Sequence, residues 1–343
     1  MYKINSFEFY RYEDIIKKED DAGYDKTAFE KMLEIKGDSD HTKLIDMLTD
    51  LNDYSIGIED VLKEHFDEEN IVYWMAFQIL MGNVDTQNRN VYLYSPLNSD
   101  IWYFIAWDND GCLMRPEYEL RNFFGSEQLG KGNQQLLGKY FVSKVSEVTV
   151  FPGKLNDAIL DLREYLNKDM LTSKIESYKN VLKPYLYLMP DAEYEPLTSE
   201  QYDQIVASLP DEIEKNYKLY LESLETPMPF YIGVPTIDGN KLKFNWDVSY
   251  DLDAEDITYS VEVARDYLFQ DVIYHNTTLT VPETEMDLPE AGQYFVRIRA
   301  TNTSGKTQDA FDYYVTDEGK HYGMKCFYIT EDNTVEEDIY EEG

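Results

Sequence analysis

The sequence predicts an α+β protein in which a helix-rich half comes before an all-β half. Over residues 12–80 apolar residues recur three and four positions apart, which is the spacing of amphipathic helices. After residue 226 short strand-like runs alternate with Gly, Asp, Asn and Pro, as they do in β-sandwiches. A single aromatic β-hairpin interrupts the helical half, and it is the segment on which the functional interpretation depends.

The helical half contains three segments before the hairpin and three after it. "KTAFEKMLEI", "HTKLIDMLTDLND" and "NIVYWMAFQILMG" come first, and Gly82 is expected to end the third helix. Residues 135–224 return to helix, with "KLNDAILDLREYL", "KIESYKNVLKPYLYLM" and "SEQYDQIVASLPDEIEKNYKLYLESL" as the strongest pieces. In between, "NVYLY" and "DIWYFIAW" predict two strands joined by a turn near residues 97–99. Four aromatic side chains of the second strand are expected in the core: Trp102, Tyr103, Phe104 and Trp107.

The all-β half resembles a fibronectin type III domain over roughly residues 229–316. The resemblance rests on Trp246 in an early strand, Tyr259 in the next, Leu288 before a turn and Tyr294 in "GQYFVRIRATNTSG". "MKCFYIT" can add a strand before an acidic tail. We therefore expect three parts: residues 1–226, a fibronectin-like sandwich over 227–316, and an extra strand with the tail over 317–343.

Composition excludes several classes of partner. The chain has 67 Asp and Glu against 31 Lys and Arg, a formal net charge of −36, so it would repel nucleic acid and anionic lipid surfaces. Nowhere do 18 apolar residues run together, and the N-terminus shows no signal-peptide pattern. Two cysteines far apart cannot build a disulfide framework. Cationic partners and metal ions remain the favoured classes.

Carboxylate and amide side chains gather at the open end of the predicted hairpin. If the two strands pair, the start of the first lies beside the end of the second, which brings Asn90 next to Asp108. Asp85, Asn88 and Asp110 belong to the same two segments and are expected in the same small volume. Such oxygen ligands suit Mg²⁺ or Mn²⁺, whereas the four histidines are scattered along the sequence and indicate no zinc site.

The spacing from Asp85 to Asn90, D-x-x-x-x-N, equals that of the protein-kinase catalytic loop, and the hairpin then leads to Asp108. Kinases need an Asp to receive the proton of the attacking hydroxyl, an Asn to hold a metal, and a second Asp to bridge metal and phosphates. Simpler interpretations remain open. Asp85 can form an Asx turn, and Asp108 and Asp110 can cap a turn. A calcium-loop register starting at Ala106 also exists, but it lacks an acidic first ligand.

The stretch "WMAFQILMGNVDTQNRNVYLYSPLNSDIWYFIAWDNDG" resembles the core of the CotH spore-coat kinase family, atypical kinases with G-N-x-D before a strand and W-D-x-D after it. The resemblance implies that Asp85 is the catalytic aspartate and that Asn90 and Asp108 bind metal, with Asp110 of the same W-D-x-D motif as a further metal residue. It also implies ATP and Mg²⁺ or Mn²⁺ as cofactors, and transfer of the terminal phosphoryl group to Ser or Thr of a spore-coat or cell-surface protein. By the same resemblance the chain is expected at the spore coat, at the cell surface or secreted.

The chain also departs from the kinase pattern. Only 84 residues precede Asp85, no G-x-G-x-x-G occurs, and no Lys lies in a strand context suited to ATP phosphates. The expectation is therefore a kinase-like domain whose N-terminal lobe is short or missing. The alternative function is a catalytically inactive kinase-like surface or spore-coat protein that only binds partners.

Overall fold

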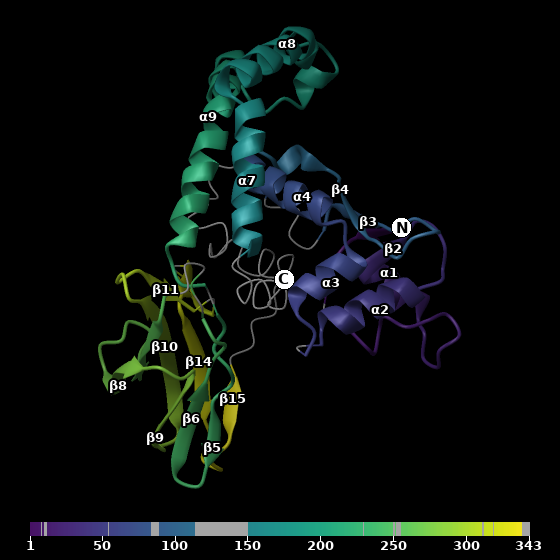
Figure 1. The fold of residues 1–343 in the computed structure, drawn as a ribbon. Coiled ribbons are helices and arrows are strands. Elements are labelled where there is room, and N and C mark those ends of the chain that lie inside the picture. Colours follow the sequence, from purple (N-terminus) through teal and green to yellow (C-terminus); the bar gives the residue numbers. More distant parts are fainter. Residues whose placement is uncertain are drawn as a thin grey trace. The chain divides into compact units, whose positions relative to one another are not determined.

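The computed structural model divides the chain into two compact units, each with its own core (Figure 1). The residues it describes are 1–7, 9, 12–53, 55–83, 89–113, 150–228, 230–249, 251, 255–310, 312–317 and 319–337. Those up to Tyr220 form what we call the first unit, and those from Leu221 onward form the β unit. The α+β class predicted from the sequence is confirmed. In the described part of the chain, no helix combines the length and the apolar character needed to cross a membrane.

The first unit is built on a four-stranded antiparallel sheet in the order β2-β1-β3-β4. The strands are β1 (Tyr2–Ile4), β2 (Leu33–Ile35), β3 (Val91–Tyr94) and β4 (Tyr103–Ala106). The predicted hairpin of β3 and β4 is confirmed. The helix expected over "KTAFEKMLEI" is shorter than predicted, because α1 (Lys26–Met32) ends where the following three residues pair with β1. Strand pairing here prevails over local helical periodicity.

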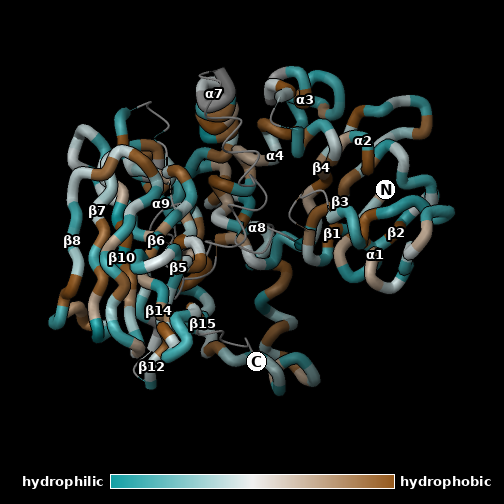
Figure 2. The backbone as a smooth tube through the Cα atoms, turned by 90° about the horizontal axis from the view of Figure 1, so that it is seen from below, coloured by the Kyte–Doolittle hydropathy of each residue, from teal (hydrophilic) through white to brown (hydrophobic). Residues whose placement is uncertain are grey.

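Helix α4 (Glu68–Met81) packs against the sheet and is apolar on nearly all sides. Its Trp74 ring lies 4.8 Å from the ring of Phe104 on β4. The Asp67 side chain caps its N-terminus, and Gly82 ends it in a left-handed conformation, as the sequence predicts. Helices α2 (Thr42–Leu51) and α3 (Ile58–His65) complete this part. Figure 2 shows brown, hydrophobic stretches where β1, β3 and β4 run together.

The outer edge of β4 is already occupied by the chain that links α3 to α4. Trp102 donates its N–H to the His65 carbonyl at 2.7 Å and accepts from the Asp67 N–H at 3.1 Å. The Asn70 amide accepts from the Phe104 N–H at 2.7 Å and donates to its carbonyl at 3.1 Å. Because these backbone groups are satisfied, the edge is closed to another strand at Trp102 and Phe104, and the hairpin is fixed against α4.

Three further helices lie in the described part of the chain after the hairpin: α7 (Val150–Tyr165), α8 (Lys168–Leu186) and α9 (Ser199–Leu224), whose last four residues lie past the boundary at Tyr220. The bounds of α9 coincide with the segment predicted from the sequence. Tyr73 of α4 donates to Asp161 of α7 at 2.9 Å. Asn216 of α9 donates to the Leu80 carbonyl at 2.9 Å, which satisfies a group that the end of α4 leaves unpaired.

The β unit consists of two main sheets around a large core, with a two-stranded sheet and a second, smaller cluster of buried residues. One sheet runs β5-β6-β9 and the other β15-β14-β10-β7-β8, with β11 paired to β10 and β12 paired to β13. The strands are β5 (Thr236–Asp238), β6 (Lys241–Asn245), β7 (Ile257–Ala264), β8 (Val272–Leu279), β9 (Glu283–Asp287), β10 (Gly292–Asn302), β11 (Thr307–Asp309), β12 (Tyr313–Thr316), β13 (Gly319–Tyr322), β14 (Met324–Ile329) and β15 (Val335–Glu337). β14 and β15 belong to the same sheet as β10, and β14 lies within "MKCFYIT", where the sequence predicts an extra strand.

The residues that suggested a sandwich lie in or against its core. Trp246 and Tyr259 are buried, with ring centroids 5.3 Å apart. Tyr294 donates its hydroxyl to the Glu290 carbonyl at 2.7 Å, a local bond of the tyrosine-corner kind seen in β-sandwiches. Leu288 packs against the same core.

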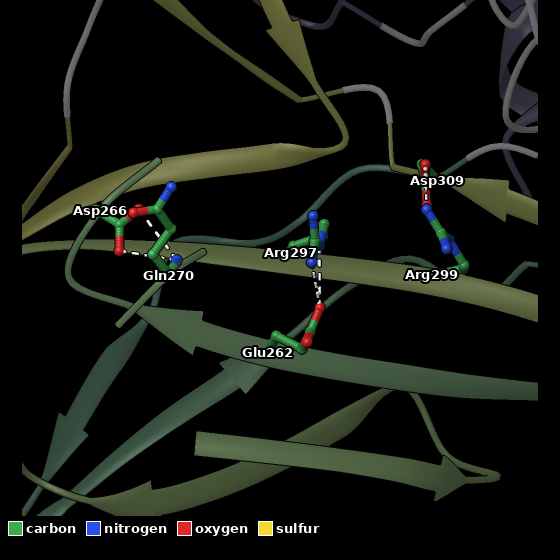
Figure 3. A network of polar contacts seen from close by, with 6 residues as sticks. All are labelled: Glu262, Asp266, Gln270, Arg297, Arg299 and Asp309. Carbon is green, nitrogen blue, oxygen red and sulfur yellow. Dashed lines mark hydrogen bonds and ion pairs between the residues drawn. The ribbon is translucent and has the colours of Figure 1, made fainter. Parts of the chain in front are cut away.

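Ion pairs join neighbouring strands of the larger sheet (Figure 3). Arg297 lies opposite Glu262 and donates to it from Nε at 3.0 Å. Arg299 lies opposite Asp309 and donates from Nε at 2.6 Å. Such cross-strand pairs at partly exposed positions fix the register more than they add stability.

Candidate functional site

The strand register places two of the predicted site residues at the same end of the hairpin. Val91 lies opposite Ala106 in the last pair before the hairpin opens. Asn90 precedes Val91, and Asp108 follows Ala106 by two residues. The amide of one strand and the carboxylate of the other therefore lie at the open end, where the sequence predicted them.

The backbone at this end is held in a conformation that few side chains adopt. Asn90 has a φ of 59° and Asp108 a φ of 57°, both in the left-handed region. Asn and Asp tolerate this region better than other side chains, because their short polar groups can form local hydrogen bonds. Leu113, at a φ of 58°, has no such compensation, so the turn after Asp108 holds strain.

The turn after β4 leaves its carboxylates accessible. Asn109–Gly111 form the short 3-10 helix η2, and Asp108 stands at its N-cap position without a side-chain capping hydrogen bond. Asp108 and Asp110 are exposed, and Asn90 is half-buried. The simpler interpretation of Asp108 as a cap of this short helix is therefore not supported by the geometry.

A buried asparagine joins this turn to the end of α4. Asn83 is 2% exposed, and its Nδ2 donates to the Asn109 Oδ1 and to the Gln78 Oε1, each at 2.9 Å. The Leu113 N–H also donates to the Met81 carbonyl at 2.9 Å. The C-terminus of α4 therefore sets the position of the acidic turn.

Neither Asn83 nor Asn109 is among the site residues predicted from the sequence. Asn83 is the Asn of the G-N-x-D pattern, so its position in the motif was the available signal. Its bond to Asn109 spans 26 residues, and no local pattern predicts a pairing of that length.

The predicted catalytic Asp85 and its neighbour Asn88 lie outside the described residues. The described chain stops at Asn83, which is bonded to Asn109, and resumes at Arg89, next to Asn90.

The two faces of the hairpin differ, which corrects the expectation that all four aromatic residues of β4 are core. Trp102 and Phe104 are buried, whereas Tyr103 is half-buried and Trp107 is 47% exposed. Side chains alternate along a strand, so Trp107 falls on the face opposite to α4. There it contacts Tyr92 edge-on, with ring centroids 5.2 Å apart. An aromatic surface therefore adjoins Asp108.

Among the described residues, three acidic or histidine side chains come within reach of one ion in one place, at Asp50, Glu64 and His65. The His65 Nε2 lies 2.8 Å from the Asp50 Oδ2, a contact that joins α2 to α3. The backbone carbonyl of His65 holds Trp102, at the end of β4 nearer to the turn of the hairpin. The contact between His65 and Asp50 is therefore interpreted as structural, since it joins two helices.

The hairpin presents an amide and carboxylates at its open end and is supported by a buried helix. Comparison with known families gives the class of the chain. The model of the CotH kinase protein family matches residues 1–220, and the chain belongs to that family. No curated protein gives a significant match.

Solved structures show only distant likenesses. The chain is similar over 25% of its length to 86% of a chain described as "Structure of FN3tt mut", at 18% identity and a TM-score of 0.18. It is similar over 28% of its length to 20% of the twitchin kinase region from C. elegans, at 17% identity and a TM-score of 0.21. Neither likeness carries an argument about function.

Proposed function

We propose that the first unit transfers the terminal phosphoryl group of ATP to a Ser or Thr hydroxyl of a protein substrate, with Mg²⁺ or Mn²⁺. Membership of the CotH kinase protein family supports this proposal. The observation that carries it is the strand register, which puts Asn90 and the exposed, uncapped Asp108 at the same open end of the hairpin.

The donor set fits a hard divalent cation. Asp108 and Asp110 offer carboxylate oxygens and Asn90 an amide oxygen, the ligand types that Mg²⁺ and Mn²⁺ prefer. Such an ion would neutralise charge on the phosphates of ATP. Asp85 would accept the proton of the attacking hydroxyl. Asn83 positions the turn that carries Asp108, and the exposed Trp107 offers a surface for the base of the nucleotide.

The β unit is proposed to be a fibronectin type III-like module that accompanies the catalytic unit. Its tyrosine-corner contact and its two-sheet order support this assignment. The spore coat or cell surface is the proposed location of its partners.

Binding and transfer can be measured separately. We expect Mn²⁺-ATP to quench the tryptophan fluorescence of the unaltered protein, and Trp107→Phe to remove most of that quench, because the indole of Trp107 adjoins the proposed metal residue. We expect Asp108→Ala to abolish the quench. Transfer of labelled phosphate to the protein itself or to casein should fall at least about 100-fold in Asp108→Ala and in Asp85→Asn, since electrostatic and proton-transfer contributions are each of that order.

Asp100→Ala is the matched control. Asp100 is exposed at the closed end of the same hairpin, where its carboxylate lies 3.6 Å from the Lys43 Nζ. The control should bind and transfer like the unaltered protein. If the unaltered protein neither binds metal-ATP nor transfers phosphate, the enzymatic proposal fails and the alternative of a kinase-like binding protein takes its place.

A further inference from the structure

The outward surface of helix α8 is apolar although the chain is strongly acidic. Six large side chains on this surface and just after it are between 53% and 73% exposed, and we call them the α8 stripe: Tyr178, Val181, Leu182, Tyr185, Leu188 and Met189. Tyr178 is three and four residues from Val181 and Leu182, and these are four and three residues from Tyr185, which places the four on one side of the helix, while Leu188 and Met189 follow its end. Figure 1 shows α8 at the ends of α7 and α9 that lie away from the sheet of the first unit.

The opposite side of α8 carries charge and faces its neighbour α9. Lys179 and Lys183 both pair with Asp203 of α9, at 3.3 Å and 2.6 Å. Lys183 also donates to the Ser199 carbonyl at 3.2 Å. A surface helix normally turns its apolar side inward and its charges outward. Because α8 does the reverse, its outer side has the character of an interface.

We propose that the α8 stripe binds the same stripe of a second copy of this chain, with the two helices antiparallel. The order of the side chains supports a two-fold axis that passes between Val181 and Leu182. Tyr178 and Tyr185 lie equally far from that point, so each would face the other across the axis. Each surface would then meet an identical surface, as a two-fold interface requires.

The charges at the two ends of the stripe favour the same arrangement. Lys174 is exposed one turn before Tyr178, whereas Asp191 and Glu193 are exposed after Met189. An antiparallel pair brings Lys174 of each copy towards the acidic end of the other, while a parallel pair would join like charges. These contacts select the orientation and act against the repulsion between two chains of net charge −36.

The size of the surface predicts a weak dimer. Six side chains cover less than the roughly 800 Å² per partner that stable interfaces bury. We therefore expect a dissociation constant on the order of 10 to 100 µM, and a monomer at lower concentrations.

Sedimentation velocity on the whole chain over that concentration range tests the proposal. The unaltered protein should pass from monomer to dimer as its concentration rises. Val181→Glu should remain monomeric, because a dimer would place two carboxylates close together at the axis. The double variant Val181→Glu/Leu182→Glu would place four there and should also remain monomeric. Leu97→Ser is the matched control, since it removes an 85% exposed apolar side chain at the hairpin turn and should dimerise normally. Unchanged circular dichroism of each variant would show that it is folded.

A charge exchange tests the orientation. Lys174→Glu alone and Asp191→Lys/Glu193→Lys alone should each dimerise at least about tenfold more weakly. Mixed together, the two variants should form a heterodimer, because both ends then carry opposite charges again. A protein that stays monomeric at every concentration, or a dimer indifferent to Val181→Glu, would overturn the proposal. A dimer that depends on Val181 but whose charge variants fail to pair when mixed would overturn the antiparallel arrangement.

Discussion

Single asparagine side chains join helix α4 to the hairpin at both of its ends. Asn70, near the start of the helix, holds the backbone of Phe104 through one accepted and one donated bond. Asn83, just after its end, holds Asn109 in the acidic turn. An amide suits both positions because it can donate and accept at once. The geometry of the site therefore depends on residues that carry no charge.

Replacing Asn70 by Ala should lower the free energy of unfolding of the first unit by about 2 to 3 kcal/mol, because two backbone groups at the edge of β4 lose their partners. Urea unfolding followed by tryptophan fluorescence measures the change. Asn180→Ala, at an exposed position of α8, is the control and should shift stability by less than about 0.5 kcal/mol. Equal effects of the two substitutions would show that the Asn70 bonds contribute nothing.

At the scale of elements, the sequence predicted those parts that depend on local pattern. Gly82 as the end of α4, the β3–β4 hairpin and the bounds of α9 all follow from periodicity and turn residues. Strands β1 and β2 were not predicted, because they are three residues long and are defined by pairing partners about 30 and 90 positions away. At the site, the strand pairing expected from the sequence predicted that Asn90 and Asp108 lie at the same end of the hairpin. The bond between Asn83 and Asn109 could not be predicted, because it depends on how α4 packs against the turn.

The connection between β1, α1 and α2 depends on a fully buried histidine. The ring of His41 stacks on Phe29 at 4.2 Å, and its Nδ1 lies 2.7 Å from the hydroxyl of Tyr2. The hydroxyl of Tyr24 lies 3.4 Å from its Nε2. Burial lowers the pKa of His41 below its usual 6.5, while the carboxylates facing it, Glu19, Asp40 and Asp38, act in the opposite direction. The neutral ring is therefore the form that the folded state favours.

This arrangement predicts a loss of stability in mild acid. Because the folded-state pKa lies below the unfolded-state value, the unfolded chain binds more protons once the pH falls below about 6.5, and the free energy of unfolding decreases from there downward. Urea unfolding at pH 7.5 and at pH 5.5 measures the difference. His41→Gln should show a smaller decrease than the unaltered protein, whereas His275→Gln, at an exposed position of β8, should show the same decrease. A steeper decrease in His41→Gln would contradict the explanation.

At the scale of the whole molecule, the two units have separate means of stability. Every sheet is contained within one unit, and the core of the β unit is formed by its own strands. Three tryptophans, at positions 74, 102 and 107, belong to the first unit, and Trp246 belongs to the β unit. The position of the tryptophans therefore allows each unit to be observed by itself.

We expect urea to unfold the chain in two transitions. Two cores that share no strand are expected to unfold independently, each at its own urea concentration. In Trp246→Phe the fluorescence reports the first unit alone, so its transition should keep the midpoint seen in the unaltered protein. Circular dichroism should show the other transition at a lower urea concentration, since the smaller ring leaves space beside Tyr259 in the core of the β unit. In Trp102→Phe the opposite result is expected: the transition of the first unit should move to a lower urea concentration, and that of the β unit should keep its midpoint. If both probes gave one common midpoint that both substitutions moved together, the units would be coupled, and substitutions in the β unit would then alter the stability of the first unit as well.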